Sequence, residues 1–176
     1  KALVFTSGNV ADNPIVIGNV QAENELGGIA DATLLYNREI HNRCDDSVTF
    51  AVNSKERVIR RSRGYAPEPV NLHFNVDGII GAGAELKNCF CVGKGNRAIL
   101  SQHIGDLKTV ETFEFYRNSI DRFKSLFRVK PLLIAHDRHP DYLSTRYAEE
   151  TGIDMVCVQH HHAHIASCMA ENGHFS

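Results

Sequence analysis

The sequence has no CxxC pair, no long apolar run and no excess of basic residues. Its five cysteines are an odd number without ribbon spacing, which argues against a disulfide framework and against a zinc ribbon. No apolar stretch approaches the roughly 20 residues that cross a bilayer, and no signal peptide is recognisable. The formal net charge of -2 provides no overall basic field for nucleic acid. We therefore expect a cytoplasmic protein with reduced thiols that binds neither membranes nor nucleic acid.

The composition is typical of a folded globular protein. Hydrophobic residues make up 43% of the chain and charged residues 23%. The length of 176 residues suffices for one ordinary domain or for parts of two. Because the chain opens inside an apolar run at residues 2–6 and closes just after an expected helix, we expect an internal piece of a longer protein.

The first third of the chain mixes helix and strand signals. Residues 2–6 predict a buried strand, which a Ser-Gly-Asn turn follows. Asn19 is expected to cap a helix that runs to about Ala30. Further strands are expected at residues 33–36, 47–52 and 57–60. Two prolines and a glycine then forbid a long regular element, so we place a domain boundary near residues 66–75.

A different pattern follows this boundary. Residues 78–101 predict a β-meander with a glycine-rich turn. A helix is predicted at residues 109–127, with one apolar stripe: Phe113, Tyr116, Ile120, Phe123 and Phe127. The rest alternates strand and helix, at residues 131–135, 140–150, 153–158 and 161–172. A right-handed crossover would make those two strands parallel, which places Asp137 and His160 at the same sheet edge. The expected fold class is mixed α/β.

Four histidines gather directly after the last expected strand. His160 and His164 are four residues apart, so a helix that starts here presents both imidazoles on one face, as two metal ligands require. The positive end of the helix dipole keeps such rings neutral, the form that binds metal. A third ligand must come from elsewhere, since zinc normally takes at least three from the protein. The alternative is a histidine-rich helix start that only forms hydrogen bonds.

Two further polar clusters are candidates for the same site. At the end of the preceding strand, Asp137 and His139 are candidate catalytic residues, whereas Asp141 suits a role as a partner of the helix dipole. The glycine-rich turn at residues 81–84 is followed by Lys87 and Asn88, which could hold a phosphate through backbone amides and a cation. The alternative for this turn is an ordinary hairpin with a solvated lysine.

The first third contains polar groups suited to a nucleotide and a small acyl group. They are Ser7 and Asn9 in the early turn, Arg43 and Asp46 before an expected strand, and Arg60, Arg61 and Arg63 as a positive patch for phosphates. Residues of these types, taken separately, are more often turn caps or solvated charges.

Seven motifs in order resemble the carbamoyltransferase HypF family, at the junction of its YrdC-like and Kae1-like domains. They are residues 6–9 (TSGN), 42–48 (NRCDDSV), 61–67 (RSRGYAP), 83–88 (GAELKN), 100–107 (LSQHIGDL), 136–145 (HDRHPDYLST) and 158–164 (VQHHHAH). The resemblance implies the C-terminal part of a YrdC-like α/β domain at residues 1–70. It also implies the N-terminal part of a Kae1-like domain of the ASKHA nucleotide-binding fold at residues 76–176.

The resemblance also implies a function in the maturation of nickel-iron hydrogenase. Carbamoyl phosphate and ATP, with Mg²⁺, would give carbamoyl adenylate, and the carbamoyl group would pass to the C-terminal cysteine of HypE. By this analogy, the adenylate pocket contains Ser7, Asn9, Arg43 and Asp46, whereas Lys87 faces phosphates. His160 and His164 match paired ligands of a divalent metal, zinc or iron. The alternatives are an enzyme of tRNA threonylcarbamoyladenosine synthesis and a non-catalytic fragment that docks a partner.

Overall fold

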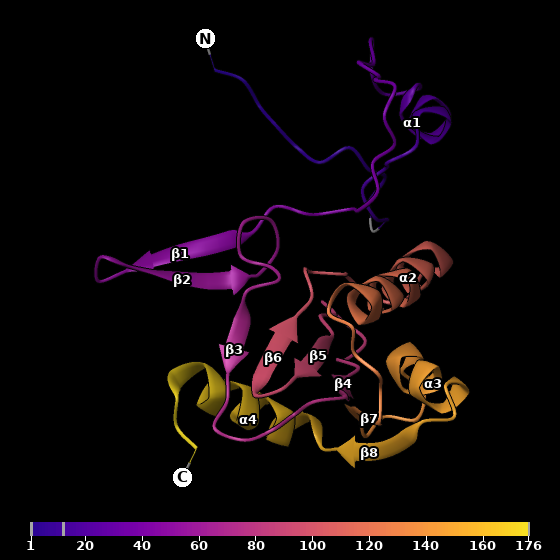
Figure 1. Cartoon of the computed structure of the whole chain (residues 1–176). Coiled ribbons are helices and arrows are strands. Elements are labelled where there is room, and N and C mark those ends of the chain that lie inside the picture. Colours follow the sequence, from indigo (N-terminus) through magenta and orange to yellow (C-terminus); the bar gives the residue numbers. More distant parts are fainter. Residues whose placement is uncertain (1, 12, 176) are drawn as a thin grey trace.

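A six-stranded sheet with the order β3-β6-β5-β4-β7-β8 forms the centre of the computed structural model, which describes residues 2–11 and 13–175 (Figure 1). The strands are β3 (Pro69–Asn71), β4 (Ile79–Gly81), β5 (Cys91–Lys94), β6 (Arg97–Leu100), β7 (Leu133–Asp137) and β8 (Asp154–Val158). Strands β4, β5 and β6 pair antiparallel in sequence order, which confirms the predicted meander. The predicted mixed α/β class is confirmed as well.

The second half of this sheet is the predicted strand-helix-strand-helix unit. Strand β7 pairs parallel with both β4 and β8, and helix α3 (Leu143–Glu150) connects β7 to β8. Helix α4 (His160–Asn172) then begins two residues after β8 and ends at Gly173, which has a left-handed φ of 69°. Asp137 pairs in register with Val158, so the side chains that follow both strands meet at one edge of the sheet.

The hydrophobic core lies between the sheet and helix α2 (Val110–Leu126). Thr109 caps this helix, since its hydroxyl accepts a hydrogen bond from the Thr112 amide. Of the predicted stripe, Tyr116, Ile120 and Phe123 are buried, and the phenylalanines at both ends pack against the core. In the described residues, the buried hydrophobic side chains all lie at or after Leu72. The core therefore belongs to the larger sheet. Separately, none of the described helices is long and apolar enough to span a membrane.

The first third of the chain forms helix α1 (Asn19–Leu26) and a hairpin of β1 (Val48–Val52) and β2 (Lys55–Arg60). The strands predicted at residues 2–6 and 33–36 are wrong, because these segments pair with no strand in the described part of the chain. An apolar run becomes a strand only when another strand completes its hydrogen bonds. Leu3, Val4 and Phe5 accordingly remain exposed.

The start of α1 also differs from the prediction. Gly18 is the capping residue, without a side-chain hydrogen bond, and Asn19 is the first residue of the helix. The Asn19 side-chain amide instead donates to the carbonyl of Tyr36 at 3.0 Å. The helix ends at Leu26, earlier than the predicted Ala30.

The expected boundary region at residues 66–75 contains β3, which pairs with β6 of the larger sheet. Figure 1 shows this short strand leading from the β1-β2 hairpin into the sheet. The domain ranges 1–70 and 76–176 stay predictions.

Candidate functional site

A cleft of about 790 Å³ lies where the carboxyl ends of β7 and β8 meet the glycine-rich turn after β4. Lys87, Asn88, Asp137, His160 and His164 all line it. They come from three separate segments of the chain. The structure thus brings five of the predicted site residues together around one space.

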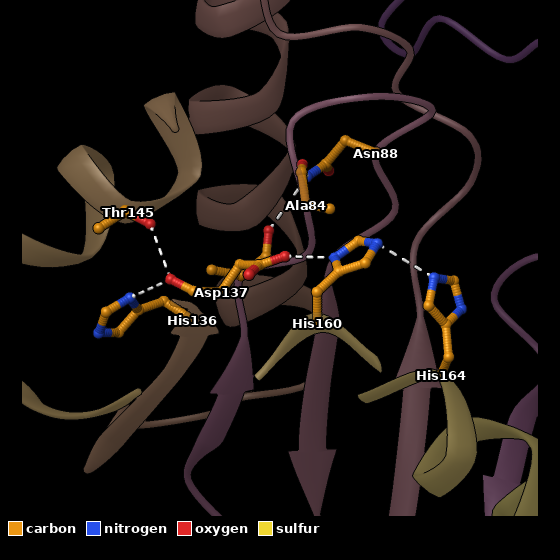
Figure 2. Close-up of polar contacts among 8 residues, drawn as sticks. Ala84, Asn88, His136, Asp137, Thr145, His160 and His164 are labelled. Carbon is orange, nitrogen blue, oxygen red and sulfur yellow. Dashed lines mark hydrogen bonds and ion pairs between the residues drawn. The ribbon is translucent and has the colours of Figure 1, made fainter. Parts of the chain in front are cut away.

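The imidazoles of His160 and His164 converge, as Figure 2 shows. Their Nε2 atoms are 3.1 Å apart, and the ring planes are at 85° to each other. With zinc-nitrogen bonds of about 2.0–2.1 Å, two nitrogens at this separation subtend an angle of about 100° at the metal, close to tetrahedral. The pair therefore fits two ligand positions of one divalent ion. Within residues 2–11 and 13–175, no group of three metal-ligating side chains occurs, so a third ligand is not among them.

Asp137 lies on the other side of the His160 ring. Its Oδ2 is 2.5 Å from Nδ1 of His160, and its side chain is only 10% exposed. Its main-chain carbonyl accepts hydrogen bonds from Thr145 Oγ1 at 3.2 Å and from His136 Nδ1 at 2.9 Å. The Asp137 carboxylate thus forms its side-chain hydrogen bond with His160. The sequence placed both residues at one sheet edge but gave no sign of this direct contact.

His139 does not line this cleft. Its ring stacks on Tyr142 with centroids 4.1 Å apart, and its Nδ1 accepts a hydrogen bond from the Asp141 amide at 3.3 Å. The two candidate catalytic residues, Asp137 and His139, therefore do not face a common space. A catalytic role of His139 stays a prediction that this geometry does not support.

The glycine-rich turn is held tightly from inside. Asn88 is buried, and its amide donates to the carbonyls of Ala82 at 3.1 Å and Ala84 at 2.6 Å. Gly83 has a φ of 74°, and a Cβ there would lie 2.5 Å from the carbonyl oxygen of Cys89. The side chain of Asn88 therefore shapes the turn from behind. Lys87 is exposed, and its own amide donates to Asp106 Oδ1 at 2.7 Å.

A second, polar cleft of about 850 Å³ lies between the first third of the chain and the segment before α2. Ser7, Asn9 and Asp46 line it together with Arg60. Arg43, predicted for the same pocket, lies elsewhere, with its guanidinium 5.6 Å above the ring of Phe115. Burial lowers the pKa of Arg43. Three of the four predicted adenylate residues thus share a cleft, and Arg43 is separate from them.

The predicted arginine patch is divided among different partners. Arg63 forms an ion pair with Asp46 at 3.6 Å, whereas Arg61 reaches Glu171 at the end of α4 at 3.9 Å. Arg60 donates from Nε to the carbonyl of Asp46 at 3.1 Å. The three guanidinium groups do not form one phosphate-binding surface.

The segment at residues 101–107 connects the two clefts, a role that sequence reasoning did not assign. Asp106 lines the polar cleft, and its Oδ1 accepts a hydrogen bond from the amide of Lys87, which lines the other cleft. His103 lines the polar cleft, and burial is the main cause that lowers its pKa. The sequence signals were the motif at residues 100–107 and its run of polar residues Ser-Gln-His directly after an apolar strand.

Two families match successive parts of the chain. Residues 1–62 match the family described as telomere recombination, the Sua5/YciO/YrdC group, and residues 75–171 match the HypF Kae1-like domain. Fold and site thus define a YrdC-like part followed by a Kae1-like part.

Similar proteins agree with this order. Carbamoyltransferase HypF2 of Cupriavidus necator is 43% identical over 178 residues, which are 97% of this chain and 22% of the relative. Carbamoyltransferase HypF of Rhizobium leguminosarum bv. viciae is also 43% identical, with the same coverage of both chains. A structure of full-length HypF in the phosphate- and nucleotide-bound form has a TM-score of 0.90 at 51% identity, and covers 96% of this chain and 27% of that one. This chain belongs to the HypF family, as the resemblance predicted, and spans about a quarter of the length of its relatives.

Proposed function

We propose that this chain is part of a cytoplasmic carbamoyltransferase of hydrogenase maturation. In the complete enzyme, water would release phosphate from carbamoyl phosphate, and the carbamate oxygen would attack the α-phosphorus of ATP, which enters with Mg²⁺, so that carbamoyl adenylate forms and pyrophosphate leaves. The carbamoyl group would then pass to the C-terminal cysteine of HypE. Relatives that cover nearly the whole chain are named carbamoyltransferases, which supports this assignment. A similar structure is described as phosphate- and nucleotide-bound, which supports a reaction with phosphate-bearing substrates.

The observation that carries the proposal is the shared cleft of the two histidines and the glycine-rich turn. His160 and His164 would hold a divalent ion, zinc or iron, which when bound polarises a carbonyl or binds phosphate oxygens. Lys87 brings a cation to the same cleft and can neutralise phosphate charge. During transfer the acceptor sulfur would bond to the carbamoyl carbon, the bond from that carbon to the phosphate oxygen of AMP would break, and the thiol proton would pass to solvent. Positive charge around the cleft would stabilise the oxygen atoms that become negative.

The polar cleft suits the earlier, adenylate-forming step. Ser7 and Asn9 offer a hydroxyl and an amide, and Asp46 offers a carboxylate to a hydroxyl or to Mg²⁺. Since Asp106 lines the polar cleft and bonds the amide of Lys87, which lines the other cleft, a product formed at one would be released near the other.

The first test uses the full-length protein and follows the exchange of labelled pyrophosphate into ATP. We expect exchange that depends on carbamoyl phosphate, because adenylate formation is reversible. Exchange that requires threonine and bicarbonate instead would contradict the proposal and indicate tRNA threonylcarbamoyladenosine synthesis.

The second test separates the two clefts. In the full-length protein, the double variant His160→Ala/His164→Ala is expected to lose bound metal and carbamoyl transfer but to keep pyrophosphate exchange. The matched control is His161→Ala/His162→Ala, which removes two imidazoles from the same turn of α4 but none that line the cleft. Elemental analysis measures the metal. Equal metal content in both double variants would refute the ligand assignment.

A further inference from the structure

Asp137 faces the ring nitrogen of His160 that a metal between the two imidazoles would not use. We propose that Asp137 is a positioning residue, whose carboxylate fixes the tautomer and the direction of the His160 ring. This inference rests on the metal site of the proposed function, and it gives Asp137 a different role from the catalytic one predicted from the sequence.

The fold places the two residues opposite each other. Strands β7 and β8 run parallel, Asp137 pairs with Val158, and the Arg138 amide donates to the Val158 carbonyl at 2.9 Å. Helix α4 starts at His160, only two residues beyond this pair. Their contact therefore follows from the strand register, although 23 residues separate them in sequence.

The backbone at Asp137 is fixed independently of its carboxylate. Thr145 and His136 both donate to its main-chain carbonyl, and these bonds do not involve the side chain. The carboxylate itself is largely buried, whereas the His160 side chain is 52% exposed. A fixed acceptor can thus orient a ring that is otherwise open to solvent.

The chemistry of the pair determines the tautomer. A neutral imidazole carries one N–H, and an ionised carboxylate only accepts hydrogen bonds. Nδ1 of His160 must therefore carry the hydrogen where it faces Asp137, which leaves the lone pair on Nε2. This lone pair points toward Nε2 of His164, 3.1 Å away (Figure 2). In the other tautomer, the hydrogen would occupy the position of the metal.

The test measures Zn²⁺ affinity of the full-length, metal-free protein by competition with a chromophoric chelator, without ATP or carbamoyl phosphate. The amide in Asp137→Asn can donate to Nδ1 and so permits the wrong tautomer. We expect it to weaken Zn²⁺ binding about 10- to 100-fold, the usual effect of losing such a partner. The control Asp141→Asn makes the same change at an exposed position outside the cleft, and is expected to bind Zn²⁺ like the wild type.

A double-mutant cycle distinguishes positioning from a general structural effect. In a His160→Ala background, Asp137→Asn is expected to cause no further loss of Zn²⁺ affinity, because its effect passes through the missing ring. If Asp137→Asn does not fold, the same cycle is run with Asp137→Glu, which displaces the carboxylate by one methylene.

Two results would overturn the inference: wild-type Zn²⁺ affinity in the Asp137 variant, or an equal loss with and without His160. Failure of the proposed function is seen separately. A full-length protein with an intact Zn²⁺ cycle but without carbamoyl-phosphate-dependent exchange would refute the function and leave the positioning role standing.

Discussion

Asn88 offers a sensitive test of how the glycine-rich turn is built. It is buried behind the turn, and its amide group donates to the carbonyls of Ala82 and Ala84. Figure 2 labels Asn88 and Ala84. The change Asn88→Ala removes both side-chain bonds but keeps the backbone amide of residue 88 and the glycines of the turn. We expect the turn to open more often, while the rest of the sheet keeps its structure.

The magnitude follows from the contacts. Two hydrogen bonds at about 0.5–1.5 kcal/mol each amount to roughly 1–3 kcal/mol. Part of this loss is offset, because Oδ1 of Asn88 is buried without a hydrogen-bond partner among the described residues, and its removal relieves about 1 kcal/mol of desolvation. At about 1 kcal/mol per bond, the middle of that range, the net loss is about 1 kcal/mol, which corresponds to a roughly 5-fold larger population of the opened turn.

Hydrogen exchange in the full-length protein, followed by mass spectrometry, measures this population. Three amides report on the turn, since Lys87 bonds Asp106, Asn88 bonds Gly105 and Leu107 bonds Glu85. Their exchange is expected to accelerate by the factor given above in Asn88→Ala. In the control Asn118→Ala, on the exposed face of α2, it should stay unchanged. Equal exchange rates in both variants would refute the bracing role of Asn88.

Four further predictions concern glycine, cysteine and a helix cap. Gly83→Ala should lower the unfolding temperature more than Gly95→Ala, because both add left-handed strain of about 1–2 kcal/mol but only a Cβ at Gly83 meets nearby atoms. Burial raises the pKa of Cys89 to about 11 and that of Cys91 to about 12. Both thiols should therefore stay protonated and react slowly with iodoacetamide at pH 8 in native but not in denatured protein, and rapid native labelling would contradict the raised pKa values. Because the folded state keeps these protons longer, stability should fall as pH rises from 9 toward about 11, which thermal unfolding at several pH values measures. Thr109→Ala should destabilise the fold by about 0.5–2 kcal/mol through loss of its cap, as thermal unfolding would show.

The second half of the fold was predictable because its signals are local. The stripe of α2 repeats at helical spacing, and the strands that flank α3 are short apolar runs between turns. The first third was predicted poorly, since residues 2–6 and 33–36 have strand-like composition but no described strand to pair with. Composition indicates that a segment favours an extended backbone, whereas a strand also requires a neighbouring strand that completes its hydrogen bonds.

The site was predictable only in part, for a similar reason. Spacing of four residues placed His160 and His164 on one helical face, and the structure brings their rings together. The contact between Asp137 and His160 depends on strand register, which spacing does not encode. Arg43 lies above Phe115 and His139 lies beside Tyr142 because of local packing. Neither residue therefore lines the cleft that the sequence predicted for it.

The central claim is that two imidazoles at the start of α4 bind one divalent ion. Anomalous diffraction from crystals of the full-length protein with Zn²⁺ tests it most directly. We predict an anomalous peak about 2.0–2.1 Å from Nε2 of both His160 and His164. Zn²⁺-loaded crystals with no anomalous peak between these two rings would contradict it.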